Sequence, residues 1–520
     1  MQYLIKKEIL ILILCLFIGF VFRFYSLEHK SLWMDEVHTF NDSRFGLRDQ
    51  IKFYKDNPTY LHPPLFFILT HLLYPFEKPE RDLRIIPFIF GTLSIPMIYL
   101  LSKQFSSAIK NPCTVALTFM TYHIYVSQDG RSYSTVMFLG MAGLYFFMSY
   151  LKFLKKKYLF LTSLFYAIQF HISYSSIPFI IFSQLLWFYK PNERFCENEN
   201  KKPFFVPFLS LNCLLLIFCL PWTIFILINY KNQIIMDPFH SEGTGSLFSI
   251  LAGIFYDWIS NLPLVIISIF FLIIFLIISE IKKNAIILLG MIFFPILGLY
   301  LFCKLFDITH FVTSRYFINF LPIFLITLFM SINISEIKFK KISKFIRFRL
   351  MFVMLLIISN LFILPLYYRS EKQDFRGLAN YLKKQLRNGD KIFVETTGFI
   401  PGILHYLEIY PENRHHTIPF FKLSETKIEY MKHFNFKNLI FSINYSKNCC
   451  TQYVQDGSRL WIVAGKATAK KIKEKSPAVL KGFFDGSFLN FNRFPTDASM
   501  YLFLWDPNSP NEKGIDMPIE

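Results

Sequence analysis

Apolar residues in this chain gather into long blocks that are separated by short polar stretches. Most blocks run for about 17 to 22 residues, the length at which an α-helix crosses a hydrocarbon core of roughly 30 Å. The pattern therefore predicts an α-helical multispanning membrane protein. The eleven expected spans lie near residues 8–25, 85–102, 111–127, 133–151, 157–170, 174–189, 204–229, 261–279, 285–303, 316–334 and 350–367.

Every second connection between the expected spans is rich in lysine and arginine. The positive-inside rule places such connections in the cytoplasm. Because the number of spans is odd, the N-terminus is expected in the cytoplasm and the segment after the last span outside it. No small-residue cleavage site follows the first block, so we interpret it as a retained anchor in the cytoplasmic (inner) membrane. The basic connections contain Lys6 and Lys7; Lys103 and Lys110; Lys152, Lys155, Lys156 and Lys157; Lys190, Arg194, Lys201 and Lys202; Lys282 and Lys283; and six more basic residues within 338–349.

The composition agrees with this class of protein. Hydrophobic residues make up 53% of the 520 positions, 64 residues are phenylalanine, and 18% are charged, which excludes an ordinary water-soluble chain. The 55 Lys and Arg residues against 36 Asp and Glu residues give a net charge of +19. Such a charge also occurs in nucleic-acid-binding proteins, but here the basic residues cluster between apolar blocks and topology accounts for them. We expect no nucleic-acid partner.

Two outer loops carry features of their own. In the first, residues 26–84, the apolar block 63–76 is too short for a span, and counting it as one would move every later basic connection to the outer side. We expect it to form a helix on the membrane surface that begins after Pro63 and Pro64. The second loop, from Tyr230 to Trp258, contains SEGTGS and is expected to be mobile, either as a lid or as a linker.

Residues 369–520 are more polar and are expected to form a periplasmic or extracellular α/β domain with its own core, behind a transmembrane catalytic domain at 1–368. An amphipathic stretch at 374–390 predicts a helix, and further helical segments are expected near 424–434 and 467–474. Strands are expected at 391–395, 438–443, 459–465 and 500–505.

Candidate reactive residues collect at the depth of the outer membrane surface. The central spans contain almost no ionisable residue, whereas transporters usually keep charged groups or broken helices near the membrane midplane. This distribution counts against transport, and we expect the outer residues to meet at one cleft. They are Asp35, Glu36, His62, Arg84, Asp129, Arg131, Tyr133, His171, His310, Arg315 and Tyr316.

Carboxylates and guanidinium groups are the chemically telling members of this set. Asp35 is the candidate general base, because partial desolvation at an interface raises the basicity of a carboxylate. Arg84, Arg131 and Arg315 point to an anion, because the guanidinium fork matches phosphate geometry, and a lipid phosphate is the anion expected at that depth. The plain alternatives are a solvated acidic loop and snorkelling flank residues.

Metal ligation has weak support in the sequence. His62, His171 and His310 are scattered and have no i, i+4 pairing, and the eight cysteines show no zinc spacing. We expect hydrogen-bonding roles for these histidines and no obligatory metal, with a divalent metal as the alternative.

Six motifs in order resemble the lipid-linked-sugar glycosyltransferases of the GT-C fold, in particular the glycosyltransferase family 39-like branch of protein O-mannosyltransferases and lipid A aminoarabinose transferases. SLWMDE resembles the first-loop acidic motif, LHPPLFFILTHLL the surface segment, and LRIIPFIFGTLSIPMIYL the Arg-x-x-Pro span entry. SQDGRSY, FHISY and SRYFINFLP are similar to later motifs, and the likeness covers residues 31–322. DFRGLANYL followed by GDKIFV is loosely similar to the outer α/β domain of bacterial members.

The resemblance implies transfer of a sugar from a polyprenyl phosphate to a glycan, lipid or protein acceptor at the outer face, and in-line attack would invert the anomeric centre. It implies Asp35 as the base with Glu36 as support, and Asp129 as a residue that positions the acceptor or Arg131. The implied donor-binding residues are Arg84, Arg131, Arg315, Tyr316, His62, Tyr133 and His171.

Two departures limit the resemblance, and two other functions compete with it. His62 stands where the aminoarabinose transferases have a lysine, so that sugar specificity is not inherited, and the β-trefoil domain of the protein mannosyltransferases is not found in the sequence. The first competitor is a transporter or flippase of lipid-linked saccharides, which predicts inverted repeats and polar groups at the midplane. The second is a receptor whose C-terminal segment binds a ligand.

Overall fold

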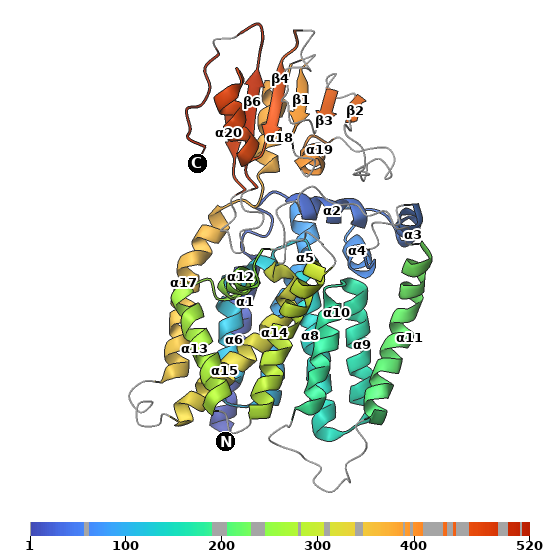
Figure 1. The fold of residues 1–520 in the computed structure, drawn as a ribbon, viewed down its shortest axis with the longest axis vertical. Coiled ribbons are helices and arrows are strands. Elements are labelled where there is room, and N and C mark those ends of the chain that lie inside the picture. The colour runs from blue at the N-terminus through green and yellow to red at the C-terminus, as the bar shows by residue number, and fades with distance from the viewer. Residues whose placement is uncertain are drawn as a thin grey trace.

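A bundle of long helices carries a smaller α/β unit at one end in the computed structural model (Figure 1). The N-terminus lies at the opposite end of the bundle, and the C-terminus belongs to the α/β unit. The structure describes residues 2–56, 62–189, 205–229, 245–278, 282–305, 313–338, 347–387, 390–395, 399–408, 430–433, 440–443, 457–486, 498–509 and 512–519.

Each expected span coincides with one helix or with two consecutive helices. Among the described residues, six helices are long and apolar enough to cross a membrane, or seven if the bent pair α12 and α13 forms one span. The multispanning class is therefore confirmed, and the number eleven stays a prediction. The helices are α1 (Gln2–Phe24), α5 (Pro79–Phe105), α6 (Lys110–Phe119), α7 (Thr121–Ser127), α8 (Tyr133–Phe153), α9 (Lys156–Ile172), α10 (Ser176–Ser183) with the 3-10 helix η1 (Gln184–Phe188), α11 (Phe205–Asn229), α12 (Leu247–Ile259), α13 (Leu262–Ile278), α14 (Lys282–Leu305), η3 (Ser314–Phe320) with α15 (Leu321–Lys338), and α17 (Phe348–Arg369).

The outer faces of several helices are apolar. Phe362 on α17 is 76% exposed and Ile228 on α11 is 75% exposed, and both belong to long apolar helices. Burial of a large apolar side chain away from water is worth about 1.5–3 kcal/mol, so a surface of such residues is stable when hydrocarbon covers it. These faces fit contact with lipid.

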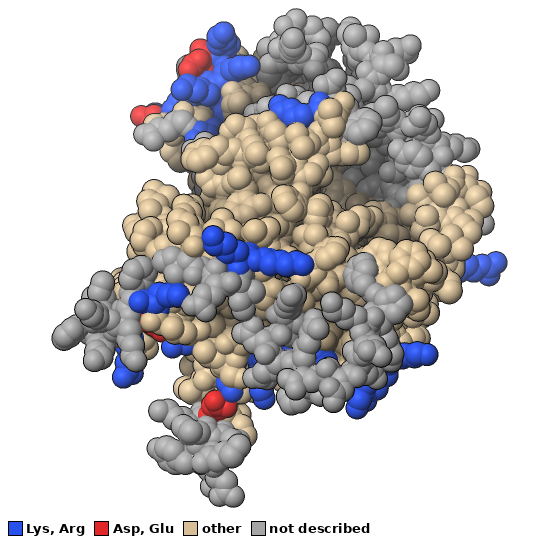
Figure 2. All heavy atoms as spheres, turned by 60° about the horizontal axis from the view of Figure 1, so that its bottom comes forward, with Lys and Arg blue, Asp and Glu red and all other residues tan. Residues whose placement is uncertain are grey.

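Basic residues are prominent at the end of the bundle that carries the N-terminus. Figure 2 shows Lys and Arg side chains around this end, with few Asp or Glu among the described atoms. The short connection between α8 and α9 lies there and carries the exposed Lys155. This distribution agrees with the expected cytoplasmic side, and the orientation in the membrane stays a prediction.

Three short helices of the first outer loop lie between the bundle and the α/β unit (Figure 1). They are α2 (Met34–Ser43), α3 (Leu47–Asp56) and α4 (Leu65–His71). The expected surface helix is thus present as α4, which begins directly after Pro63 and Pro64. It covers half of the apolar block, and the chain turns at Leu72, whose N–H donates to Leu69 O and Thr70 O.

The expected mobile loop from Tyr230 to Trp258 is wrong in its second half. Residues 230–244 lie outside the described residues, but Leu247–Ile259 form the helix α12, which is bent by 109° against α13. Its side chains at Ile250, Ile254 and Trp258 follow each other at intervals of four and are buried in the bundle core. An apolar stripe with this period is typical of an amphipathic helix. The preceding SEGTGS sequence led to the expectation of a loop.

The α/β unit contains a six-stranded sheet in the order β2-β3-β1-β4-β6-β5. β1 is parallel to β3 and β4, and the remaining pairs are antiparallel. The predicted strands correspond to β1, β3, β4 and β6, and β5 was not predicted. The elements are β1 (Lys391–Val394), β2 (Tyr430–His433), β3 (Ile440–Ile443), β4 (Leu460–Ala464), β5 (Val479–Phe484), β6 (Met500–Trp505), α18 (Phe375–Gln385), α19 (Ile400–Tyr406) and α20 (Lys466–Lys475).

Two helices were expected in this unit between its strands. The helix expected near 424–434 is wrong at its end, because β2 pairs there with β3 as an edge strand, and pairing with a neighbour outweighs weak local preference. The helix expected at 467–474 is present as α20. Glu395 occupies its N-terminus by accepting from Gly465 N–H (3.3 Å) and from the Thr468 hydroxyl (2.8 Å).

Candidate functional site

Four segments that are distant in sequence meet where the bundle adjoins the α/β unit. They are the start of α2, the turn between α7 and α8, the start of η3, and the connection between α17 and α18. Acidic residues at the first turn of α2 suit the positive end of the helix dipole. Gln373 fixes this start by accepting a hydrogen bond from Met34 N–H (2.8 Å) on its side-chain oxygen.

Glu36 and Arg84 form a fully buried ion pair beneath the site. Both side chains are at most 1% exposed. Arg84 has five N–H donors, and every one of them meets a protein oxygen. The five acceptors are Glu36 Oε1 (2.7 Å), Glu36 Oε2 (2.6 Å), and the carbonyl oxygens of Leu27 (2.9 Å), Lys30 (3.0 Å) and Ser31 (3.1 Å).

The same carboxylate anchors the turn between α7 and α8. Gly130 N–H donates to Glu36 Oε1 over 2.7 Å. A Cβ atom at Gly130 would lie 3.2 Å from Glu36, so the absence of a side chain permits this close approach. Burial alone would raise the pKa of Glu36, but the charges of Arg84 and Lys372 lower it to about 2.

These contacts bear on two of the expected site residues. Every N–H of Arg84 already meets a protein oxygen and the side chain is buried, so no donor is left over for a phosphate. Both oxygens of Glu36 are held by Arg84 and Gly130, so any support of the base by Glu36 is indirect. The pair instead joins α2, α5 and the α7–α8 turn. Sequence spacing could not reveal the carbonyl and carboxylate oxygens that surround the Arg84 guanidinium.

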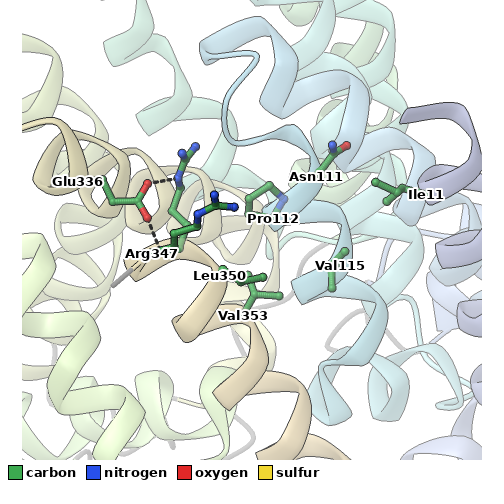
Figure 3. Close-up of a pocket in the computed structure, with 9 residues that line it drawn as sticks. Ile11, Asn111, Pro112, Val115, Glu336, Arg347, Leu350 and Val353 are labelled. Carbon is green, nitrogen blue, oxygen red and sulfur yellow. Dashed lines mark hydrogen bonds and ion pairs between the residues drawn. The ribbon is translucent and has the colours of Figure 1, made fainter. Parts of the chain in front are cut away.

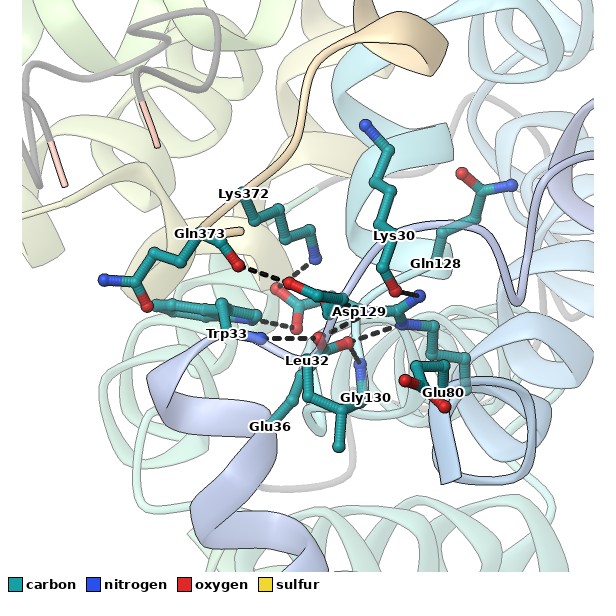
Figure 4. Close-up of polar contacts among 12 residues, drawn as sticks. Lys30, Leu32, Trp33, Glu36, Glu80, Gln128, Asp129, Gly130, Lys372 and Gln373 are labelled. Atoms are coloured by element: carbon teal, nitrogen blue, oxygen red, sulfur yellow. Dashed lines mark hydrogen bonds and ion pairs between the residues drawn. The ribbon is translucent and has the colours of Figure 1, made fainter. Parts of the chain in front are cut away.

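Asp129 directly precedes Gly130 in the chain. It contacts two residues that the sequence analysis did not select. Trp33 Nε1 donates to Asp129 Oδ1 (3.0 Å), and Lys372 Nζ lies 3.5 Å from Asp129 Oδ2 (Figure 4). Asp129 is 0% exposed and Lys372 is 4% exposed. Neither Asp129 Oδ2 nor Lys372 Nζ has a hydrogen bond to another described residue.

Burial acts on both members of this loose pair. It raises the pKa of Asp129, an effect that the charge of Lys372 opposes. It lowers the pKa of Lys372, an effect that Asp129 and Glu36 oppose. A buried ammonium at 3.5 Å from its counter-ion, with unused hydrogen-bonding capacity, is well suited to accept a further anionic partner.

Asp35 is the partly exposed carboxylate of the site. Its Oδ2 lies 3.5 Å from Arg315 Nη1, and the two side chains are 23% and 10% exposed. Arg131 Nη1 donates to the Asp35 carbonyl oxygen (3.3 Å) and to Thr39 Oγ1 (3.2 Å). The structure therefore brings Asp35, Arg131 and Arg315 together, although they come from three separate segments.

Aromatic rings hold the cations of the site in place. The Arg315 guanidinium lies 5.0 Å from the ring centroid of Trp33 and 5.8 Å from that of Tyr133. Lys372 Nζ lies 5.8 Å from the Trp33 centroid as well, and 4.7 Å from that of Tyr125. Two cations at one indole ring repel each other, so an anion between or beside them would stabilise the arrangement.

The remaining expected residues are placed as follows. Tyr316 is next to Arg315 in η3 and lies within electrostatic range of Asp35 and Arg131. His62 is exposed and lies within electrostatic range of Arg131 and Asp35. His171 Nε2 lies 3.1 Å from Phe218 O, between α9 and α11, so its hydrogen bond joins two helices of the bundle. His310 lies outside the described residues.

Sequence reasoning missed Trp33, Lys372 and Asp257. Trp33 lies inside the SLWMDE motif and so carried a readable signal. Lys372 follows the last span between Arg369 and Arg376 and does not stand out from these neighbours. Asp257 lies on α12, is 0% exposed, and is within electrostatic range of Arg315. It fell within the segment that was expected to be a loop.

A metal centre has no ready ligand set in the described part of the chain. No group of three or more His, Cys, Asp or Glu residues there is arranged to hold an ion. Carboxylates of the site lie near cationic side chains instead. Whether the protein depends on a metal stays a prediction.

Comparison with known proteins identifies the fold. No family model and no curated protein matches the sequence. ArnT from Cupriavidus metallidurans in the apo state aligns with a TM-score of 0.53 at 10% identity, over 96% of this chain and 98% of that chain. The same protein bound to undecaprenyl phosphate aligns with a TM-score of 0.51 at 10% identity over the same shares. An oligosaccharyltransferase from Archaeoglobus fulgidus aligns with a TM-score of 0.45 at 11% identity, over 80% of this chain and 62% of that chain. The chain thus has the fold of ArnT, and the GT-C fold that its motifs indicate is confirmed.

Proposed function

We propose that this chain transfers a sugar from a polyprenyl phosphate to a hydroxyl group of a glycan, lipid or protein at the outer face of the cytoplasmic membrane. The single observation that carries the proposal is the partly exposed Asp35 carboxylate within 3.5 Å of Arg315, beside Arg131 and Lys372. The structure of ArnT with undecaprenyl phosphate supports the choice of lipid, because that protein of the same fold binds this compound.

Asp35 is the proposed general base. The acceptor oxygen forms a bond to the anomeric carbon while the bond from that carbon to the phosphate oxygen breaks. The acceptor proton passes to Asp35, and polyprenyl phosphate leaves with the electron pair. Asp35 suits this task better than Glu36 or Asp129, since it is 23% exposed on its side chain and the other two are fully buried.

Arg315 and Lys372 are the proposed phosphate ligands. Both lie at the Trp33 ring, and Lys372 Nζ has no hydrogen-bond partner among the described residues. Positive groups fixed in advance stabilise the charge that develops on the leaving phosphate without reorganising in the transition state. Arg131 supports the Asp35 backbone and stands next to this pair.

The Glu36–Arg84 pair is the proposed support of the site. It fixes the positions of the residues that flank it, Asp35 on α2 and Asp129 before Gly130. Catalytic groups need to be held within fractions of an ångström, and a buried pair with all donors used is a rigid means of doing so.

Reconstituted protein tests the proposal. The full chain would be purified into liposomes with polyprenyl-phosphate-linked sugars and with the membrane lipids and glycans extracted from cells that carry it as the source of acceptor, and release of polyprenyl phosphate would be measured. We expect release with the native chain and loss of release with Asp35→Asn, while Asp49→Asn, an exposed acid on α3, keeps it. Movement of the intact lipid-linked saccharide across the bilayer without release would favour the flippase instead.

A further inference from the structure

A pocket lies at the other end of the bundle from the candidate site. It has a volume of about 500 Å³ and is lined by residues of α1, α6, α15 and α17 (Figure 3). It lies at the first turns of α17, whereas the candidate site follows the last turn of that helix. A helix of 22 residues is about 33 Å long, so the pocket is separate from the sugar-transfer chemistry.

One wall of the pocket is apolar. Ile11 comes from α1, Val115 from α6, and Leu350 and Val353 from α17. Leu350 is 50% exposed, although it is a large hydrophobic residue. A wall of this kind is stabilised when it is covered by a hydrocarbon chain.

The other wall is polar and has a net positive charge. Arg349 is held by Glu336, which accepts from its backbone N–H (2.7 Å) and from its guanidinium, and Arg349 Nη1 donates to Ala108 O (3.0 Å). Arg347 lies at the same wall and is exposed. Asn111 Oδ1 is buried without a hydrogen-bond partner among the described residues.

We propose that this pocket binds an anionic phospholipid of the cytoplasmic leaflet. The phosphate would lie against Arg347 and Arg349, a headgroup hydroxyl would donate to Asn111 Oδ1, and an acyl chain would cover Val115 and Leu350. Basic pockets between membrane helices on the cytoplasmic side suit acidic headgroups. A free phosphate would satisfy the arginines and leave the apolar wall uncovered, so the lipid accounts for both walls.

The position of the pocket supports this occupant. It lies at the end of the bundle where Lys and Arg side chains are prominent and acids are few (Figure 2). Lys110, at the start of α6, pairs with Glu8 of α1 over 2.8 Å and adds a further cation near Asn111. The inference uses the expected cytoplasmic side of this end and does not depend on the proposed sugar transfer.

Native mass spectrometry of the full chain tests the proposal. The protein would be supplied with equal amounts of dioleoyl phosphatidylglycerol and dioleoyl phosphatidylcholine in detergent, with free sn-glycerol 1-phosphate as a competitor. We expect preferential binding of phosphatidylglycerol and a reduction of about tenfold in that binding with Arg347→Gln, because one charge-assisted contact is lost. Lys155→Gln, which removes an exposed cation in the α8–α9 connection, is the matched control and should leave binding unchanged.

A second variant tests the apolar wall. Val115→Phe fills part of the pocket and is expected to weaken binding of phosphatidylglycerol while the chain keeps its thermal stability. Equal binding of both lipids that Arg347→Gln does not alter would overturn the proposal. Displacement of phosphatidylglycerol by glycerol phosphate at equal concentration would overturn it as well, since the ligand would then be a soluble anion.

Discussion

Asp35 Oδ2 lies 3.5 Å from Arg315 Nη1, although Asp35 belongs to α2 and Arg315 to η3, which are far apart in the sequence. The contact joins a carboxylate that water can reach to a guanidinium that is 10% exposed. An ion pair of this length leaves room for a ligand to rearrange it, whereas the bidentate pair of Glu36 and Arg84 does not. The Asp35–Arg315 pair therefore suits contact with a ligand, and the Glu36–Arg84 pair suits a structural role.

Asp35→Asn should abolish sugar transfer, because an amide cannot accept the acceptor proton. General base catalysis contributes roughly 10²- to 10⁴-fold, so the rate should fall by about that factor. Release of polyprenyl phosphate by the purified variant measures this, with thermal unfolding as the test of folding. Near-native turnover in a folded Asp35→Asn variant would remove Asp35 from the role of base.

Arg315→Gln should weaken binding of the leaving lipid phosphate. A lost charge-assisted hydrogen bond corresponds to about tenfold in affinity or more. Equilibrium binding of undecaprenyl phosphate to the purified chain measures the effect, and Arg369→Gln, at the end of α17, serves as a control of equal charge change. Unaltered affinity in Arg315→Gln would contradict a phosphate contact.

Glu36→Gln should destabilise the fold more than it alters chemistry. It leaves the Arg84 guanidinium buried without a counter-ion, and breaking such a pair lowers the free energy of unfolding by about 3–5 kcal/mol. Thermal unfolding in detergent measures the loss. In Glu36→Gln combined with Arg84→Met, stability should partly return, since no uncompensated charge remains. A stable but inactive Glu36→Gln variant would point to a direct role in the reaction.

Acid should weaken the fold through the same carboxylate. Arg84 and Lys372 hold the pKa of Glu36 at about 2, below its ordinary 4.5. A depressed carboxylate contributes stability that is fully present above the ordinary pKa and is lost as the pH falls toward the folded value. The unfolding temperature of the native chain should therefore drop below about pH 4.5, and the drop should be smaller in Glu36→Gln. Parallel curves for the two proteins would contradict this assignment.

The sequence was informative wherever a property depends on neighbouring residues in the chain. Hydropathy located the helices of the bundle, because the composition of about 20 successive residues decides whether a helix can lie in hydrocarbon. Sidedness then predicted that Asp35, Arg131 and Arg315 meet at one depth, and the structure brings them together. Motif likeness indicated the fold, which the comparison with ArnT confirms.

The sequence was less informative wherever distant contacts decide the outcome. The sequence predicted Arg84 as a phosphate ligand, because it does not show that five oxygens of the first outer loop, three carbonyl and two carboxylate, surround its guanidinium. Lys372 was not selected from the sequence, because its approach to Asp129 depends on how α17 ends against the α7–α8 turn. β2 was missed because an edge strand of four residues is defined by its partner.

Lys372 also lies in the short segment that connects α17 to the α/β unit, two residues before Asp374, the N-cap of α18. A tilt of that unit relative to the bundle therefore shifts a positive charge at the Trp33 ring. We therefore expect a displacement of the α/β unit to be felt at the candidate site through this short covalent connection, because the same few residues carry both the Lys372 charge and the cap of α18.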